Sequence, residues 1–134
     1  MQRQSVQTAA PFEPIVGYSR AVKTGPFIAV TGTASLDERG EMFGAGDAAA
    51  QTRRCLTIIA ETLAKLGAQL GDVVRTRIFV TDISQWETIG RVHGEVFGAI
   101  RPATTMVEVR ALIDPRMLVE IEADAIVLAE LAAR

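Results

Sequence analysis

The C-terminal part of the chain carries the sharpest alternation of apolar and polar residues. From residue 119 to 127 every odd position is apolar, and positions 120, 122 and 124 are Glu, Glu and Asp. A period of two residues is typical of a strand with one apolar face. A weaker alternation over residues 104–109 predicts another strand, and the turn signal Asp114-Pro115 separates the two segments. We therefore expect these strands to form an antiparallel pair.

The acidic face of the 119–127 strand leaves two interpretations open. Three carboxylates on one strand face repel one another and lower stability if that face is both dry and unpaired. The face is either a hydrated surface or part of a polar cavity or subunit interface in which Glu120 does chemistry. Arg75 and Arg77 share a face of the strand predicted over residues 73–80, so pairing across strands is one way to neutralise the carboxylates.

Two amphipathic helices are predicted between the strands. The first follows Asp47, a suitable N-cap, repeats apolar residues every three or four positions up to residue 66, and ends at Gly67. The second follows the capping residues at 81–84 and is closed by Gly98. Its apolar stripe includes His93, the only histidine, which is better explained as a packed residue than as a metal ligand.

The N-terminal half is less periodic. Residues 1–14 are polar and contain two prolines, so we expect an arm, with extended structure beginning near Ile15. A turn cluster at 23–26 predicts a hairpin whose second strand runs to Gly32, where the missing side chain allows a ligand or another backbone to come close. An ordinary glycine at a strand end is the competing interpretation. Residues 41–43 are long enough only for a short edge strand.

This order of elements describes a single α+β domain over residues 1–134, in which two helices cover one face of a mixed, mostly antiparallel sheet. The other face must be hydrated or buried by self-association.

A net charge of −2 and the lack of a basic run make nucleic acid a poor default partner. The chain shows no signal peptide and no apolar run of transmembrane length, which favours a soluble cytoplasmic protein. Cys55 is the only cysteine, so neither a disulfide framework nor a multi-cysteine zinc site is available.

Short motifs spread over nearly the whole chain resemble the RidA/YjgF family. They lie at residues 17–18, 31–32, 49–51, 71–72, 79–82, 102–103 and 119–123, and the most specific is the closing pattern Pro-Ala, Val-Glu-Val and Val-Glu-Ile-Glu-Ala. The resemblance implies a chorismate-mutase-like fold assembled as a homotrimer with three ligand clefts between subunits. It also implies hydrolysis of reactive enamines or imines to keto acids and ammonia, without metal or cofactor.

The resemblance also implies roles for individual positions. Tyr18 and Trp86 match aromatic walls of the cleft, Gly32 matches a glycine whose backbone approaches the ligand, and Glu120 matches the acid that positions the attacking water. Two other cleft positions, Thr104 and Met106, depart from the pattern. Thr104 stands where deaminating members have an arginine that clamps the substrate carboxylate, and Met106 replaces a small residue or cysteine.

The departure at Thr104 bears on specificity because a neutral hydroxyl cannot copy a bidentate guanidinium contact. Arg20 and Arg101 are alternative cations, although neither occupies the matching position. Our first hypothesis is a trimer that hydrolyses an imine or enamine of non-standard specificity, with Glu120 as the base. The second is a ligand-binding or regulatory trimer without turnover. Ribonuclease activity, a third hypothesis, has little support from the acidic charge balance.

Overall fold

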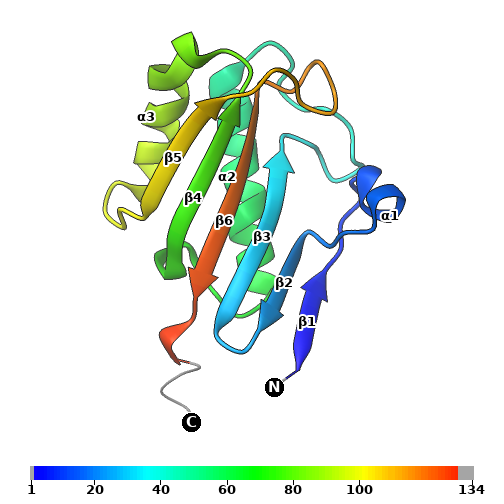
Figure 1. The fold of residues 1–134 in the computed structure, drawn as a ribbon, viewed down its shortest axis with the longest axis vertical. Coiled ribbons are helices and arrows are strands. Elements are labelled where there is room, and N and C mark those ends of the chain that lie inside the picture. Colours follow the sequence, from blue (N-terminus) through cyan, green and yellow to red (C-terminus); the bar gives the residue numbers. More distant parts are fainter. Residues whose placement is uncertain (1, 130–134) are drawn as a thin grey trace.

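The computed structural model describes residues 2–129. The strands are β1 (Arg3–Val6), β2 (Ala21–Thr24), β3 (Phe27–Ala34), β4 (Val73–Val80), β5 (Ala103–Glu108) and β6 (Val119–Ile126), and the helices are α1 (Phe12–Val16), α2 (Ala48–Lys65) and α3 (Trp86–Phe97). The strands form one sheet in the order β1-β2-β3-β6-β4-β5 (Figure 1). All neighbours are antiparallel except β4 and β5.

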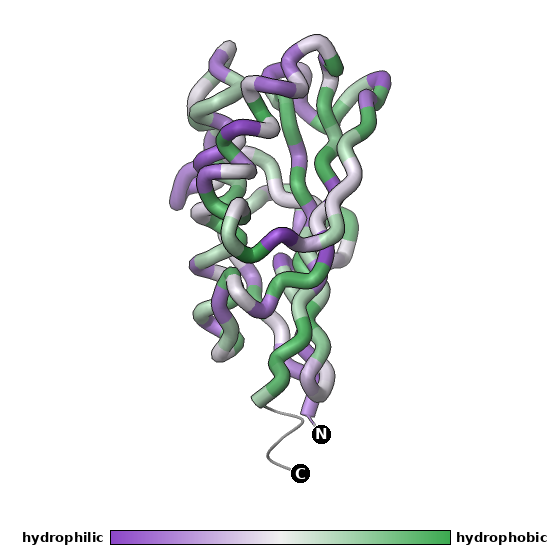
Figure 2. Tube along the Cα trace, turned by 90° about the vertical axis from the view of Figure 1, so that its left-hand side faces the viewer, coloured by the Kyte–Doolittle hydropathy of each residue, from purple (hydrophilic) through white to green (hydrophobic). Residues whose placement is uncertain are grey.

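Helices α2 and α3 pack on the same face of the sheet, which confirms the predicted α+β class and the mostly antiparallel sheet. Seen from the side, the helices form one layer and the strands another (Figure 2). The apolar positions of β6, Val119 and Ile121, are fully buried against this helical layer. The alternating carboxylates of β6 therefore face away from the helices.

The ends of α2 follow the predicted capping chemistry. The Asp47 side chain accepts a hydrogen bond from the Ala50 N–H at 3.0 Å, and Gly67 adopts φ 76° just after the last turn. None of the helices that the structure describes is long and apolar enough to cross a bilayer.

The expected antiparallel pairing of β5 with β6 is wrong. β4 lies between them, antiparallel to β6 and parallel to β5. Parallel neighbours need a long crossover, and α3 supplies it by connecting β4 to β5. The two-residue alternation identifies a strand and its buried face but carries no information about which strand lies beside it.

The N-terminal segment is more structured than the expected arm. Its first residues form β1, which pairs with β2, and the predicted extended structure near Ile15 is wrong because Ile15 lies in α1. Pro11 and Pro14 fit this turn, since a proline in the first helical turn loses no intrahelical hydrogen bond. Gly17 then ends the helix in a left-handed conformation, φ 87°, with its N–H bonded to the Glu13 carbonyl.

Two smaller predictions also have outcomes. The hairpin of β2 and β3 is confirmed, although its turn is tighter than predicted because β2 continues to Thr24. The proposed short strand at 41–43 amounts to one isolated bridge between Leu36 and Met42.

Of the two arginines predicted to pair with the acidic face of β6, Arg77 forms ion pairs with it. The Arg77 guanidinium lies 3.5 Å from the Glu122 carboxylate and 3.1 Å from that of Asp124. This cross-strand arrangement balances two of the three carboxylates of β6, and Arg77 forms no ion pair with Glu120. Glu120 is thus set apart from the other two acids of its strand.

Candidate functional site

A cavity of about 640 Å³ lies between the N-terminal segment, the loop after β5, and the sheet. Tyr18, Gly32 and Glu120 line it together with Arg20 and Glu122, and α2 contributes residues to a further part of the lining. Three of the six predicted site residues therefore share one cavity in a single chain. The volume is within the range typical of small-molecule pockets.

A β-bulge places Gly32 next to Glu120. The register of β3 and β6 passes from Val30 opposite Ala123 to Thr33 opposite Ile121, so β3 has one residue more than its partner over this stretch. A Cβ atom at Gly32 would lie 2.9 Å from both Cδ and Oε2 of Glu120, which is closer than side chains approach one another. Position 32 must lack a side chain for the Glu120 carboxyl group to occupy its observed place. The close approach predicted at Gly32 is thus found, and the approaching group is a side chain of the same protein.

The environment of Glu120 disfavours its ionised form. Burial raises the pKa of the Glu120 carboxyl, the positive charge of Arg20 lowers it, and the negative charge of Glu122 raises it, with a net increase above the ordinary value. Raised carboxyl pKa values are typical of groups that exchange protons near neutral pH. Glu120 therefore combines a position in the cavity with a pKa raised by burial.

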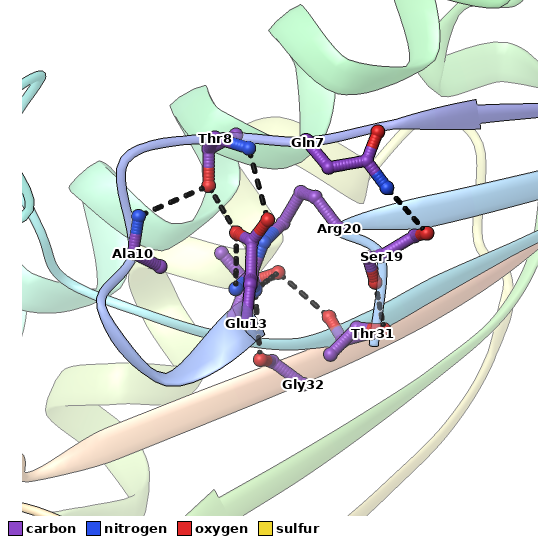
Figure 3. Close-up of polar contacts among 9 residues, drawn as sticks. Gln7, Thr8, Ala10, Glu13, Ser19, Arg20, Thr31 and Gly32 are labelled. Atoms are coloured by element: carbon purple, nitrogen blue, oxygen red, sulfur yellow. Dashed lines mark hydrogen bonds and ion pairs between the residues drawn. The ribbon is translucent and has the colours of Figure 1, made fainter. Parts of the chain in front are cut away.

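Arg20 occupies the space between the N-terminal segment and the bulge (Figure 3). It is only 4% exposed, and its Nη1 donates to the Gly32 carbonyl at 2.9 Å and to the Thr33 hydroxyl at 3.3 Å. Its Nη2 donates to Glu13 Oε2 at 3.3 Å, while the Tyr18 ring centroid lies 5.6 Å from the guanidinium carbon. Arg20 thus touches the backbone, a buried acid and the aromatic wall of the cavity.

The alternative that Arg20 replaces the missing carboxylate clamp finds no support in this arrangement. A substrate carboxylate would have to compete with Glu13, which is itself 3% exposed and already paired with Arg20. Arg101 is exposed, adopts φ 58°, and lies just before β5. It is not among the residues that line the cavity.

The other predicted site residues, Trp86, Thr104 and Met106, lie away from this cavity. Trp86 begins α3 and is 57% exposed, and Thr104 is exposed on the edge strand β5. Met106 is half-buried, and both its Cε and a ring carbon of Trp86 lie 4.0 Å from the Cβ position of Gly90. A single chain thus carries two separate groups of predicted site residues, one around Glu120 and one around Thr104.

The Thr104 hydroxyl belongs to a hydrogen-bond chain that leads into the core. It lies 2.8 Å from the Thr76 hydroxyl, which lies 2.9 Å from Nε2 of His93. Burial lowers the pKa of His93, which favours the neutral imidazole, and its ring packs on Phe97 with centroids 4.7 Å apart. His93 is a packed helix residue, as predicted, and it also orients the hydroxyl chain that ends at Thr104.

Cys55 fits a structural role. It is fully buried, and burial raises the pKa of its thiol. Among residues 2–129, no three His, Cys, Asp or Glu side chains are placed to hold a metal ion together.

Sequence reasoning missed Glu13 as the buried partner of the cavity-lining Arg20. It lies in the segment interpreted as an arm, and no periodic pattern marks it as buried. A proline on each side, at positions 11 and 14, and Gly17 were the available signals for a tight turn that would bring its side chain back onto the chain.

Comparison with known proteins identifies the family. A family profile described as Endoribonuclease L-PSP, which covers the RidA/YjgF proteins, matches residues 8–127. The chain is 38% identical over 108 residues to the 3-aminoacrylate deaminase RutC of Acinetobacter baylyi, covering 81% of this chain and 85% of that protein. The protein belongs to the RidA/YjgF family.

Solved structures agree with the sequence comparison. The crystal structure of Rv2704 from Mycobacterium tuberculosis, described as a YjgF/YER057c/UK114 family member, is 54% identical, with a TM-score of 0.86 and coverage of 94% of this chain and 100% of that one. The YjgF gene product of Escherichia coli is 28% identical, with a TM-score of 0.80 and coverage of 92% and 98%. The fold seen here is therefore the fold of this family.

A substitution at Gly32 tests how closely the bulge and Glu120 are coupled. Gly32→Ala needs no left-handed backbone, so the free energy of unfolding should change by no more than about 1 kcal/mol. The new methyl group must displace the Glu120 carboxyl group, and we expect any activity that depends on Glu120 to fall on the order of tenfold to a hundredfold. Steady-state kinetics and thermal unfolding measure the two effects.

Gly71→Ala is the matched control, because Gly71 has open space at its Cβ position and lies outside the cavity lining. Equal activity losses in both variants would show that the close contact at Gly32 has no specific effect.

Proposed function

We propose that this protein hydrolyses an imine or enamine to a carbonyl compound and ammonia, with Glu120 as the general base. The observation that carries the proposal is the Glu120 carboxyl group held over Gly32 in the cavity, with its pKa raised by burial. The similarity to a protein named 3-aminoacrylate deaminase supports the same class of reaction.

The proposed reaction starts from the protonated imine. Water attacks the imine carbon and gives one proton to the Glu120 carboxylate, forming a neutral carbinolamine. Glu120 then returns the proton to the nitrogen, the C–N bond breaks, and the nitrogen leaves as ammonia while the hydroxyl oxygen becomes the carbonyl and releases its proton to ammonia. The sum is iminium plus water giving carbonyl compound plus ammonium. A carboxylate serves both steps only if its pKa lies close enough to the working pH to release the proton again.

Tyr18 and Gly32 supply the shape of the proposed site. Gly32 gives the Glu120 carboxyl group its place, and the half-buried Tyr18 ring forms an aromatic wall beside Arg20. Trp86, Thr104 and Met106 are separated from this cavity within one chain, and we propose that they face Glu120 of another copy across a subunit boundary.

This arrangement requires contact between copies of the chain, and we propose the homotrimer with small-molecule clefts between subunits that the family resemblance implies. The strand register places two exposed apolar side chains on the sheet face away from α2 and α3, Phe27 at 45% and Val107 at 41%, and association would bury them. We expect a mass of three chains in light scattering at micromolar concentration. A stable monomer under these conditions would contradict the intersubunit cleft.

The test of the proposed activity is turnover of a panel of imines, measured as ammonia release by the purified protein. The panel should include imines derived from amino acids and imines without a carboxylate, because the cations of the cavity lining differ in their availability. Arg20 is paired with Glu13 and Arg54 with the Leu36 carbonyl, whereas Lys65 is exposed. Accelerated hydrolysis of at least one imine supports the proposal, and no acceleration across the panel rejects it.

A non-catalytic ligand-binding trimer is the second candidate, and the exposed hydroxyl of Thr104 favours it. Its position is where the family resemblance places the arginine of deaminating members, and its hydrogen bonds run to Thr76 and the Pro102 carbonyl. A metabolite found by mass spectrometry after gentle purification, together with no turnover of the panel, would establish this candidate.

The endoribonuclease activity named in the description of the family profile finds less support, because acidic side chains in the cavity lining would repel a phosphate backbone. These side chains are Asp37, Glu38, Glu61, Glu120 and Glu122.

A further inference from the structure

The Glu13–Arg20 ion pair is buried, and a buried ion pair needs additional partners to offset the cost of dehydration. Glu13 accepts hydrogen bonds from the Thr8 N–H at 3.0 Å and from the Thr8 hydroxyl. Arg20 has the Gly32 carbonyl and the Thr33 hydroxyl as further acceptors. The described residues contain no buried side-chain nitrogen or oxygen without a partner, so this cluster is internally complete. A complete cluster holds its members in one geometry.

The cluster around Arg20 includes the Gly32 carbonyl, which the bulge removes from the hydrogen bonds between β3 and β6. Neither Thr31 nor Gly32 has a partner in the β3–β6 register, because the extra residue of a bulge is left unpaired. The Arg20 guanidinium binds the Gly32 carbonyl at 2.9 Å, and the Arg20 carbonyl accepts from the Thr31 N–H at 3.0 Å. Arg20 therefore stabilises both residues of the bulge, and Gly32 is the residue against which the Glu120 carboxyl group lies.

The charges around Glu120 come from several elements. Arg20, just before β2, is the cation that acts on Glu120. Glu122 acts from β6, the strand of Glu120 itself, and the Cys55 thiol lies behind it on α2. Arg77 of β4 is held by Glu122 and Asp124. Other ionisable groups of the cavity lining are Tyr18, Asp37, Glu38, Arg54, Glu61 and Lys65. Glu13 is the acid paired directly with Arg20, so it decides how much of the arginine charge reaches Glu120.

We propose that Arg20 is a positioning residue for the hydrolysis proposed above, which fixes the Gly32 bulge beneath Glu120 and, through its balance with Glu13, sets the charge that Glu120 experiences. Arg20 does not bind substrate in this proposal. The inference rests on the proposed role of Glu120 and adds the pair that holds Glu120 in place.

Because Arg20 and Glu13 have opposite charges, removing one or the other should shift the Glu120 pKa in opposite directions. Arg20→Gln removes the cation that favours ionised Glu120, so the pKa of Glu120 should rise and the acid limb of the kcat/KM profile should move to higher pH. Glu13→Gln leaves the arginine charge unbalanced, so the same limb should move to lower pH. A pair that only stabilised the fold would lower the melting temperature in both variants and leave the acid limb in place.

The experiment compares Arg20→Gln, Glu13→Gln and the double variant with the parent. The double variant contains no unpaired buried charge, so it remains available if Arg20→Gln does not fold. We expect the double variant to behave like Arg20→Gln, with an acid limb above that of the parent and kcat lowered on the order of tenfold to a hundredfold. Arg53→Gln is the control, because Arg53 forms an exposed ion pair with Glu95 at 3.4 Å and lies outside the cavity lining.

A second readout separates this inference from the proposed function. Titration of Glu120 by NMR in protein labelled with carbon-13 glutamate, assigned with Glu120→Gln, reports the Glu120 pKa without any turnover. Displacements of the Glu120 pKa in opposite directions in Arg20→Gln and Glu13→Gln would support the inference, even if no imine is hydrolysed. A lack of imine hydrolysis would reject only the proposed function. Displacements in the same direction, or none beyond that of Arg53→Gln, would overturn it.

Discussion

Replacing Glu120 with glutamine is expected to lower kcat for imine hydrolysis by about 10²- to 10⁴-fold, the usual contribution of a positioned general base. Glutamine keeps the shape of the side chain over Gly32 and removes only its ability to take a proton from water. The assembly and its melting temperature should remain close to those of the parent, because Glu120 forms no ion pair within residues 2–129 whose loss would leave a buried charge. Steady-state kinetics measures kcat, light scattering measures the mass of the assembly, and thermal unfolding measures the melting temperature.

Asp124→Asn is the matched control for this variant. Asp124 lies on the same face of β6, pairs with Arg77 at 3.1 Å, and is not part of the cavity lining. It should retain most of the parent activity. If Glu120→Gln also retains it, Glu120 is one more member of a hydrated acidic face, which is the simpler interpretation of the alternation in β6.

The pH dependence follows from the same carboxyl group. The base must be ionised to accept a proton, so kcat/KM should fall as the pH decreases through the Glu120 pKa. Burial raises that pKa, which places the fall at a higher pH than an exposed glutamate would give.

The elements with strong periodicity could be predicted from the sequence alone. The strand over residues 73–80 has the predicted bounds, and the helix that starts after Asp47 ends at Lys65, one residue before the predicted end. Both patterns reflect burial against one neighbouring layer. The pairing of β5 and β6 could not be predicted in the same way. Burial on one face looks the same whichever strand lies alongside, and the crossover through α3 was the only signal for a parallel β4–β5 pair.

The cavity was predictable only in part. Gly32 could be identified as a candidate because a strand glycine is visible in the sequence, and Glu120 because the family resemblance distinguishes it from the other two acids of its strand. Their contact depends on the bulge in β3. The burial of Glu13 and Arg20 depends on the same bulge and on the α1 turn. Neither residue alternates with apolar neighbours, so hydrophobic patterning gives no reason to place these charges in the interior.

The second group of site residues shows a different limit. Thr104 lies on the helix-facing side of β5, beside the buried Thr76, whereas Glu120 points away from the helices. Side chains on opposite faces of one sheet cannot enclose one ligand. A shared site for Glu120 and Thr104 therefore requires contact between copies of the chain, and the trimer prediction and the site prediction stand or fall together.

Replacing Thr104 with arginine is expected to raise hydrolysis of an imine derived from an amino acid on the order of tenfold to a thousandfold. The guanidinium would form a bidentate, charge-assisted contact with the substrate carboxylate, which is roughly twice as strong as a neutral hydrogen bond. Because Thr104 is exposed, the longer side chain has room to extend into solvent, and the substitution removes the hydroxyl that bonds to the buried Thr76. The gain should appear mainly in kcat/KM, through better capture and orientation of the substrate.

Thr104→Lys separates geometry from charge, because an ammonium group attracts a carboxylate without the planar two-point contact. We expect its gain to be smaller than that of Thr104→Arg, and neither variant should gain on an imine that lacks a carboxylate. A parent already as fast as Thr104→Arg would show that another cation, such as the exposed Arg101, holds the carboxylate. A folded arginine variant without any gain would show that the hydroxyl chain from His93 through Thr76 to Thr104 does not face the site of catalysis.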